Sequence, residues 1–318
     1  MIGAASSVLL SLAGLVASAG PASAGHVGCG DFIFASTVLD SDIGPCGVGL
    51  TIVADNITLD LNGHTISGRE GPGDGPGVLI DGRTGVVVKN GTVTQFDAGV
   101  AIEGGSGNTV ENMRIVDNRG DFSTDYGDGI AVFVSTENVI RNNIVQNNGP
   151  YDGIGLIGAD RNTVEGNQVL FNNMDVGTSG IRLENIGLNS ADGNLVLNNV
   201  VQSSGNHGIQ LFARAKDNII RGNQSFRNRV DGITVAAGGT RNLIENNSSR
   251  FNGRDGIRIS AAAGTVPAAT NNTIRRNSAT GNVVFDLRDL NVNCDANIWT
   301  GNIASSPAKV SPPCTLNP

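Results

Sequence analysis

The chain has 318 residues, a net charge of −8 at pH 7 and only 4% aromatic residues, and 45 of its residues are glycine. An acidic chain with so few aromatic side chains argues against a nucleic-acid-binding protein, since phosphate and base contacts need clustered basic and aromatic residues. Abundant glycine would indicate disorder in a chain without a repeat, so the question is whether the sequence repeats.

The first segment, residues 1–24, is predicted to be a secretory signal peptide. An apolar run extends from Val8 to Val16, and Ala22-Ser23-Ala24 supplies the small residues of a cleavage site before Gly25. No Lys or Arg precedes the run, a departure that a misassigned start codon would explain. The run is short and interrupted, so we expect a secreted, extracellular protein without a membrane span.

A repeat of about 24 residues dominates the rest of the chain. Its clearest copies start at Asn218 and Asn242, and each continues into an Asp-Gly-Ile motif at Asp231 and Asp255. A fixed period of this length indicates a solenoid, in which each unit buries its apolar face against its neighbours.

Two aliphatic columns accompany the repeat and contain no polar residue. Their spacing of two residues predicts short strands with both columns pointing inward, because side chains alternate along a strand. The first column is Leu50, Val78, Val100, Ile130, Ile154, Ile181, Ile209, Ile233 and Ile257. The second column is Ile52, Ile80, Ile102, Val132, Leu156, Leu183, Leu211, Val235 and Ile259.

Asparagine forms a third column, broken only by one methionine. Asn tolerates the left-handed backbone of a sharp turn, and its amide can bond the amides above and below it in a stack. We therefore expect a scaffold role, an asparagine ladder. The column is Asn62, Asn90, Met113, Asn143, Asn167, Asn199, Asn223, Asn247, Asn277 and Asn302.

These features predict an all-β, single-domain parallel β-helix of about ten coils stacked about 4.8 Å apart. We expect an N-terminal cap over residues 25–48, the solenoid over 49–290 and a C-terminal cap over 291–318. The four cysteines lie in pairs near the two ends, and a rod of this length allows only the local disulfides Cys29–Cys46 and Cys294–Cys314. The alternative, a zinc site, lacks nearby histidine partners.

The repeated Asn-x-x-x-x-Asn and Asp-Gly-Ile motifs resemble the right-handed parallel β-helix proteins of the pectate-lyase-like superfamily, including the NosD-type (PbH1) repeat group. The segment from Ile57 to Ile66 also looks like the first coil of secreted bacterial members. The resemblance covers about residues 29–318. It implies the fold but not an activity, because the fold hosts lyases, hydrolases, epimerases and non-catalytic proteins.

Charge is distributed unevenly along the chain. Residues 1–160 carry 6 Lys and Arg against 18 Asp and Glu, a net charge of −12, whereas residues 161–318 carry 15 against 11, a net charge of +4. In a rod, sequence order becomes position along the axis, so a polyanionic ligand would prefer the later coils, near residues such as Arg214. The alternative is ordinary variation on a solvated surface.

A column of mostly polar residues precedes the glycine at the start of each of these strands. It reads Ala98, Asp128, Asp152, Ser179, His207, Asp231 and Asp255. Aspartate here usually accepts backbone N–H bonds in a turn. Carboxylates one or two coils apart also match the spacing of glycosidase acid pairs, and histidine exchanges protons near neutral pH. We therefore take Asp128, Asp152 and His207 as catalytic candidates, with a turn role as the alternative.

The repeat is interrupted around Arg119–Tyr126, Met174–Ser179 and Glu184–Asp192, and loops on a rigid solenoid often carry binding function. These insertions should flank the outward face of the middle coils and form a shallow groove for a sugar chain. The substrate-binding candidates there are Tyr126, Tyr151, Arg182, Glu184, Gln210 and Arg214, with Arg182 suited to a uronate carboxylate.

No complete catalytic motif of the superfamily is present. Asn206-His207-Gly208 and Arg214-Ala215-Lys216 resemble parts of a polygalacturonase site, but they lie within one coil and the Asp-Asp pair is missing. The Asp-Pro-His motif of mannuronan epimerases is absent, and His and Met are too scattered for copper delivery.

We therefore expect a secreted carbohydrate-binding or structural module whose partner is a polysaccharide or cell-surface glycan, without a metal or other cofactor. The alternative is a polysaccharide lyase, hydrolase or epimerase acting on uronate-containing glycans. A calcium ion would be required only if the activity were that of a lyase.

Overall fold

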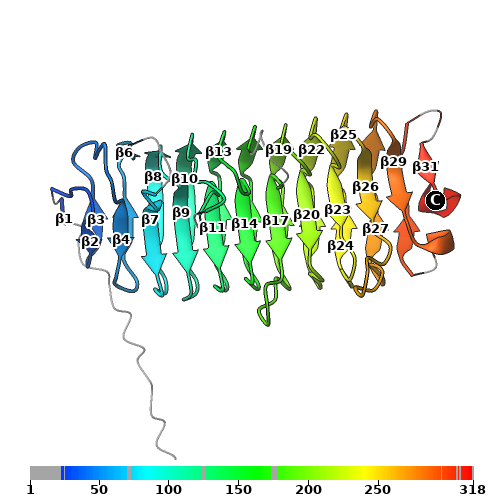
Figure 1. Ribbon diagram of the computed structural model, residues 1–318, viewed down its shortest axis with the longest axis horizontal. Helices are drawn as coiled ribbons and strands as arrows, with labels where there is room; N and C mark the ends of the chain where they lie inside the picture. The colour runs from blue at the N-terminus through cyan, green and yellow to red at the C-terminus, as the bar shows by residue number, and fades with distance from the viewer. Residues whose placement is uncertain are drawn as a thin grey trace, which may run out of the picture.

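The computed structural model describes residues 23–24, 26–69, 73–123, 126–172, 178–294, 296–305, 307 and 309–316. These residues form a rod of stacked coils, with the chain advancing steadily from one end to the other (Figure 1). Neighbouring strands pair in parallel and in register. The predicted signal peptide lies outside the described residues, except for residues 23–24. Among the described residues, no helix is long and apolar enough to cross a membrane.

One face of the rod is a twelve-stranded parallel sheet, here called the front sheet. Each coil contributes one strand to it. The strands are β2 (Phe32–Ile33), β4 (Leu50–Ile52), β7 (Pro76–Asp81), β9 (Ala98–Glu103), β11 (Ile130–Phe133), β14 (Ile154–Ile157), β17 (Ile181–Glu184), β20 (Ile209–Phe212), β23 (Ile233–Val235), β26 (Asp255–Ile259), β29 (Phe285–Asp289) and β31 (Val310–Ser311).

The other two faces form one nineteen-stranded sheet, because β8 and β10 run through the corner that separates the faces in later coils. One face holds β1 (Ser23–Ala24), β3 (Thr37–Val38), β5 (Thr58–Asp60), β8 (Val87–Thr94), β10 (Thr109–Val116), β12 (Val139–Arg141), β15 (Thr163–Glu165), β18 (Leu195–Leu197), β21 (Ile219–Arg221), β24 (Leu243–Glu245), β27 (Thr273–Arg275) and β30 (Ile298–Thr300). The other holds β6 (Thr65–Ser67), the later halves of β8 and β10, β13 (Ile144–Gln146), β16 (Gln168–Leu170), β19 (Val200–Gln202), β22 (Gln224–Phe226), β25 (Ser248–Arg250) and β28 (Ser278–Thr280).

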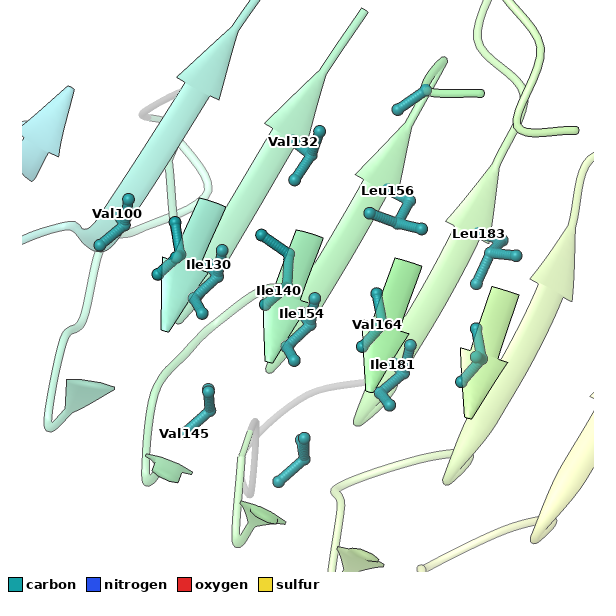
Figure 2. Close-up of a cluster of buried hydrophobic side chains, with 14 of the residues drawn as sticks. Val100, Ile130, Val132, Ile140, Val145, Ile154, Leu156, Val164, Ile181 and Leu183 are labelled. Atoms are coloured by element: carbon teal, nitrogen blue, oxygen red, sulfur yellow. The ribbon is translucent and has the colours of Figure 1, made fainter. Parts of the chain in front are cut away.

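The core is the pair of aliphatic columns predicted from the sequence. Ile154 pairs through Ile181 with Ile209, and the row continues through Ile233 to Ile257, all fully buried. Figure 2 shows this packing in the middle coils, where front-sheet side chains face Val and Ile side chains from the other two faces. Burial of one such side chain stabilises the folded state by about 1.5–3 kcal/mol, so the columns supply the main driving force for coiling.

Asparagine ladders support three corners of the coil, not only the one predicted. In the predicted ladder each Nδ2 donates to the Oδ1 of the next coil, for example from Asn223 to Asn247 at 3.0 Å, and also to a buried carbonyl. A second ladder runs from Asn108 to Asn297. A third runs from Asn118 to Asn282, with Ser204 in place of one Asn.

One member of the predicted asparagine column, Asn90, was assigned wrongly by one residue. Met113 pairs with Gly91, so Asn90 lies one place before the ladder, while Asn62 lies in a turn that is two residues longer than the matching stretch of β8. Both take a left-handed φ, 61° at Asn90 and 50° at Asn62. The left-handed role and the ladder role therefore belong to adjacent positions, and the ladder asparagines such as Asn143 lie just after the left-handed residue.

Both ends are closed by the predicted disulfides, Cys29–Cys46 and Cys294–Cys314, with Cα–Cα distances of 5.2 and 6.3 Å. The segments predicted as caps also contribute strands, β2 at one end and β31 at the other. Two short 3₁₀ helices, Val292–Cys294 and Pro313–Leu316, cover the C-terminal end. The domain boundaries themselves remain predictions.

Candidate functional site

A cleft of about 560 Å³ lies on the outward face of the front sheet, across β9, β11, β14 and β17. Its lining includes four carboxylates, Glu103, Asp128, Asp152 and Glu184, and a single cation, Arg182. We call it the acidic cleft. Its floor is low because the outward residues there are small: Ala131 and Gly155 pair side by side.

The aspartates at the start of β11 and β14 connect one coil to the next. Asp128 Oδ1 accepts the backbone N–H of Asp152 at 2.9 Å, and Asp152 Oδ1 accepts that of Ser179 at 2.6 Å. The turn role expected for this column is thus present, but each bond reaches the next coil and not the residue's own turn. Asp128 keeps one carboxyl oxygen, Oδ2, that is buried and has no hydrogen-bond partner among the residues that the structure describes.

The two aspartates differ from ordinary carboxyl groups in their protonation. Burial, reinforced by the neighbouring charge of Asp152, raises the pKa of Asp128 well above its usual value. Burial also raises the pKa of Asp152 to about 6, although Arg182 opposes the rise. Near neutral pH the pair can therefore hold one neutral acid beside one carboxylate, which is the combination that general acid–base chemistry uses.

Arg182 is held by contacts within the protein. Its guanidinium lies 2.9 Å from Glu184 Oε2 and 4.5 Å above the ring centre of Phe212. Its charge is therefore shared with a carboxylate on its own strand, and its Nε has no hydrogen-bond partner among the described residues. This arrangement leaves it less suited to a uronate carboxylate than the sequence suggested.

Aromatic rings form one wall of the acidic cleft. The ring of Tyr151 meets that of Phe122 edge-on, with centroids 5.7 Å apart. Tyr126 packs edge-on against Phe133 at 6.3 Å, and its hydroxyl donates a hydrogen bond to Glu103. Flat apolar faces beside hydrogen-bonding carboxylates are typical of sites that bind sugars or other small polar rings.

The structure thus brings most of the candidate residues together. Asp128, Asp152, Tyr151, Arg182 and Glu184 line the acidic cleft directly, and Tyr126 contacts it through Glu103. Candidate positions 124, 125 and 174–177, in the insertions, lie outside the described residues.

Three candidates lie elsewhere, beginning with His207. Its Nδ1 lies 3.2 Å from Asp231 Oδ2, and Asp231 is also bound by Arg254. Burial opposes ionisation of Asp231, but hydrogen bonds from His207 and Arg254 outweigh it and hold its pKa below the usual range. His207 is therefore part of an internal ion-pair network and does not line the acidic cleft.

Gln210 and Arg214 are the other two. The Oε1 of Gln210 accepts a hydrogen bond from the Ser179 hydroxyl at 2.9 Å. Arg214 follows the end of β20 and lines a different hollow on the same side of the rod.

Several lining residues were missed by the sequence reasoning. Glu103 and Ile157 occupy the same column as Phe133 and Glu184, at the end of each front-sheet strand, so extending that column would have found them. Phe122 lies in an insertion that was recognised, but nothing in the sequence showed that its ring turns back toward Tyr151. Within the described part of the chain, no group of three or more His, Cys, Asp or Glu is arranged to hold a metal ion.

Comparison with known proteins agrees with this architecture and defines its class, a solenoid of parallel coils. The right-handed β-helix region family matches residues 32–182 and 180–306, and the chain belongs to this family. No curated protein matches the sequence.

Solved structures of the same fold include three with a clear overall likeness. The Dettilon tailspike protein is 21% identical, with a TM-score of 0.68 over 88% of this chain, which spans 58% of the tailspike chain. The A-module of the Azotobacter vinelandii mannuronan C-5 epimerase AlgE4 is 14% identical, with a TM-score of 0.58 over 89% of this chain and 87% of its own. Pectate lyase Pel9A is 15% identical, with a TM-score of 0.56 over 85% of this chain and 70% of its own. At these identities the likeness establishes the fold alone.

Proposed function

We propose that this chain binds a glycan in the acidic cleft. The observation that carries the proposal is the juxtaposition of the Tyr151 and Phe122 rings with carboxylates on a rigid, outward-facing sheet. Rings stack on the apolar face of a sugar, and carboxylates accept hydrogen bonds from its hydroxyl groups. The fold is shared with proteins whose names refer to mannuronan and pectate, which supports a polysaccharide ligand.

The charges in the acidic cleft favour a neutral sugar over a uronate at this position. Even with Asp128 protonated, three carboxylates line it against one arginine, and that arginine is already paired with Glu184. A carboxylated sugar would be repelled unless most of these groups were protonated.

Calorimetric titration of the purified protein with a panel of neutral and acidic oligosaccharides tests the proposal. Tyr151→Ala should weaken binding of the best ligand by about tenfold or more, the loss of one stacking contact. Phe251→Ala is the matched control, because Phe251 is an exposed ring outside the cleft. Equal affinity of the wild type and Tyr151→Ala would overturn the proposal.

A second candidate, hydrolysis of the bound glycan, is favoured by the unpartnered Oδ2 of Asp128. A protonated Asp128 could donate its proton to a glycosidic oxygen while a nearby carboxylate accepts one from water or attacks the sugar. Incubation with pectin, polygalacturonate, alginate and neutral glycans, with reducing ends and unsaturated products measured, tests this. Asp128→Asn should then reduce turnover by about 10²–10⁴-fold while binding persists; inactivity of the wild type on every glycan would leave binding alone.

We also propose that the protein is exported. The apolar segment Val8–Val16 with its cleavage pattern and the two disulfides support this location. N-terminal sequencing of the protein recovered from outside the producing cell should begin at or near Gly25; retention of the full chain inside the cell would contradict it.

A further inference from the structure

A second hollow, of about 730 Å³, lies beside the acidic cleft where the front-sheet strands β17 to β29 end. Two hairpins form its walls. One is closed by the antiparallel bridge between Ile186 and Asn189, the other by the bridge between Ala263 and Val266. In Figure 1 the green loop that extends below the end of β17 is the first hairpin. Between them the coils turn tightly over small residues such as Ala213, Ala236 and Ala237.

The charge of this hollow is opposite to that of the acidic cleft. Its lining contains Arg214 and Arg258 and no Asp or Glu among the described residues. We call it the arginine trough. No carboxylate of the described chain lies within ion-pair distance of Arg214, and the nearest acid to Arg258 is Asp255, with Nη1 and Oδ2 3.5 Å apart.

Asp255 cannot neutralise the arginines around it. Its Oδ2 is shared by Arg258 and Arg288, each at 3.5 Å, and by Arg254 at 3.8 Å, and it makes no hydrogen bond. Arg258 and Arg288 are also register neighbours on adjacent strands. Burial, and after it the nearby Arg254, lowers the pKa of Arg258, although Asp231 and Asp255 oppose the fall.

The backbone sets the direction in which the Arg214 side chain leaves the turn. Ala213 and Arg214 both take left-handed φ values, 50° and 73°, in the turn after β20. Gly238 makes room for the side chain, since a Cβ there would lie 2.6 Å from Arg214 Cγ. An exposed guanidinium with no ion-pair partner among the described residues, which starts from a turn of defined backbone conformation, is suited to recognising an anionic group.

The two hollows share one wall and can be reached by one ligand. Ile186 lines the acidic cleft, while Asn185 and Gly187, its chain neighbours, line the arginine trough. Arg182 and Arg258 stand in the same outward column, three strands apart through Gln210 and Thr234. Three strands correspond to about 14 Å along the rod, which is a span that an extended oligosaccharide covers.

We propose that the arginine trough is a second subsite, which binds an acidic substituent, carboxylate or sulfate, of the same glycan that places a neutral sugar in the acidic cleft. This inference rests on the proposed function. It predicts a ligand of mixed character, with its acidic group about three coils toward the C-terminal end from the neutral sugar.

Paired oligosaccharides test it: uronate-containing chains, their carboxyl-reduced counterparts and sulfated derivatives of the reduced chains, titrated at low and high salt. The wild type should prefer an acidic member by at least about tenfold at low salt. Arg214→Gln and Arg258→Gln should each remove most of that preference and leave the affinity for the reduced chain unchanged. Arg250→Gln, an exposed arginine on β25, is the charge-matched control. The carboxylated and sulfated arms identify which group is recognised.

The outcomes separate the two proposals. If the preference for acidic chains is absent, or survives both arginine substitutions, the proposed subsite is wrong, even if Tyr151→Ala still weakens binding of the reduced chain. If Arg214→Gln and Arg258→Gln remove the preference while Tyr151→Ala changes nothing, the trough binds anions but the proposed function of the acidic cleft is wrong. If no chain binds, both fail.

Discussion

Substitution of Asn223 by Ala tests how much of the stability of the rod comes from its asparagine ladders. The Nδ2 of Asn223 donates to the carbonyl of Val196 at 2.8 Å and to Asn247 Oδ1 at 3.0 Å. Its Oδ1 accepts both the backbone N–H and the Nδ2 of Asn199, at 2.9 and 3.0 Å. Alanine would leave the Val196 carbonyl and the Asn199 backbone N–H buried without this partner, whereas Asn199 Nδ2 keeps its bond to the Val164 carbonyl and Asn247 Oδ1 keeps the bond from the backbone N–H of residue 223.

An unsatisfied buried polar group costs about 1–3 kcal/mol, so the loss of partners for two groups in Asn223→Ala should lower the free energy of unfolding by at least about 2 kcal/mol. Gln224→Ala, one residue away but exposed, should change it by less than about 0.5 kcal/mol. Urea unfolding followed by circular dichroism gives the comparison, with the transition slope checked because a solenoid can unfold in parts. Equal midpoints for the two variants would refute the assignment of stability to the ladder.

Three further predictions concern the acidic cleft and the ends. Because burial raises the pKa of Asp152 from 3.8 to about 6, the folded state holds a proton that the unfolded chain has released, so this group's contribution to stability is full below pH 3.8 and is lost as the pH rises to about 6. Thermal unfolding against pH should show this loss in the wild type relative to Asp152→Asn, and parallel curves would contradict it. Gly155→Ala should weaken glycan binding, because the new Cβ would lie 2.9 Å from Asp128 Oδ1, whereas Ala131→Gly should leave binding within about twofold; the reverse order would count against the cleft. Peptide mapping without reduction should recover Cys29 linked to Cys46 and Cys294 to Cys314, and cross-linked pairs between the two ends would show that the rod is wrong.

The coil, its interior and its end disulfides could be predicted because each coil repeats the same constraint. A period-two aliphatic pair such as Ile154 and Leu156 can be buried only by stacking identical coils, and the local disulfides then follow from length. The exact positions of the asparagine ladder were harder to predict from the sequence. Asn90 differs from the true column by one residue because β8 and β10 run through a corner that later coils turn, and spacing alone does not show where a corner lies.

The candidate site was only partly accessible from sequence. Asp128, Asp152, Arg182 and Glu184 share regular positions in neighbouring coils, so the repeat itself brings them together. His207 stands in the same column as the aspartates, but its ring contacts Asp231 on the next coil. This contact depends on the orientation of the side chains, which the repeat does not specify. Arg214 lies beyond the regular strand, where the turn at Ala213 decides its direction. The repeat therefore predicts neighbours along a column but not which of them face a common cleft.

The most direct test of the account is a crystal structure of the protein with an oligosaccharide that binds it in solution. The account predicts a sugar ring stacked on Tyr151, with one of its oxygens within hydrogen-bonding distance of Asp128 Oδ2, which has no hydrogen-bond partner in the described part of the chain. An oligosaccharide bound on another face of the rod, with these two residues untouched, would contradict it.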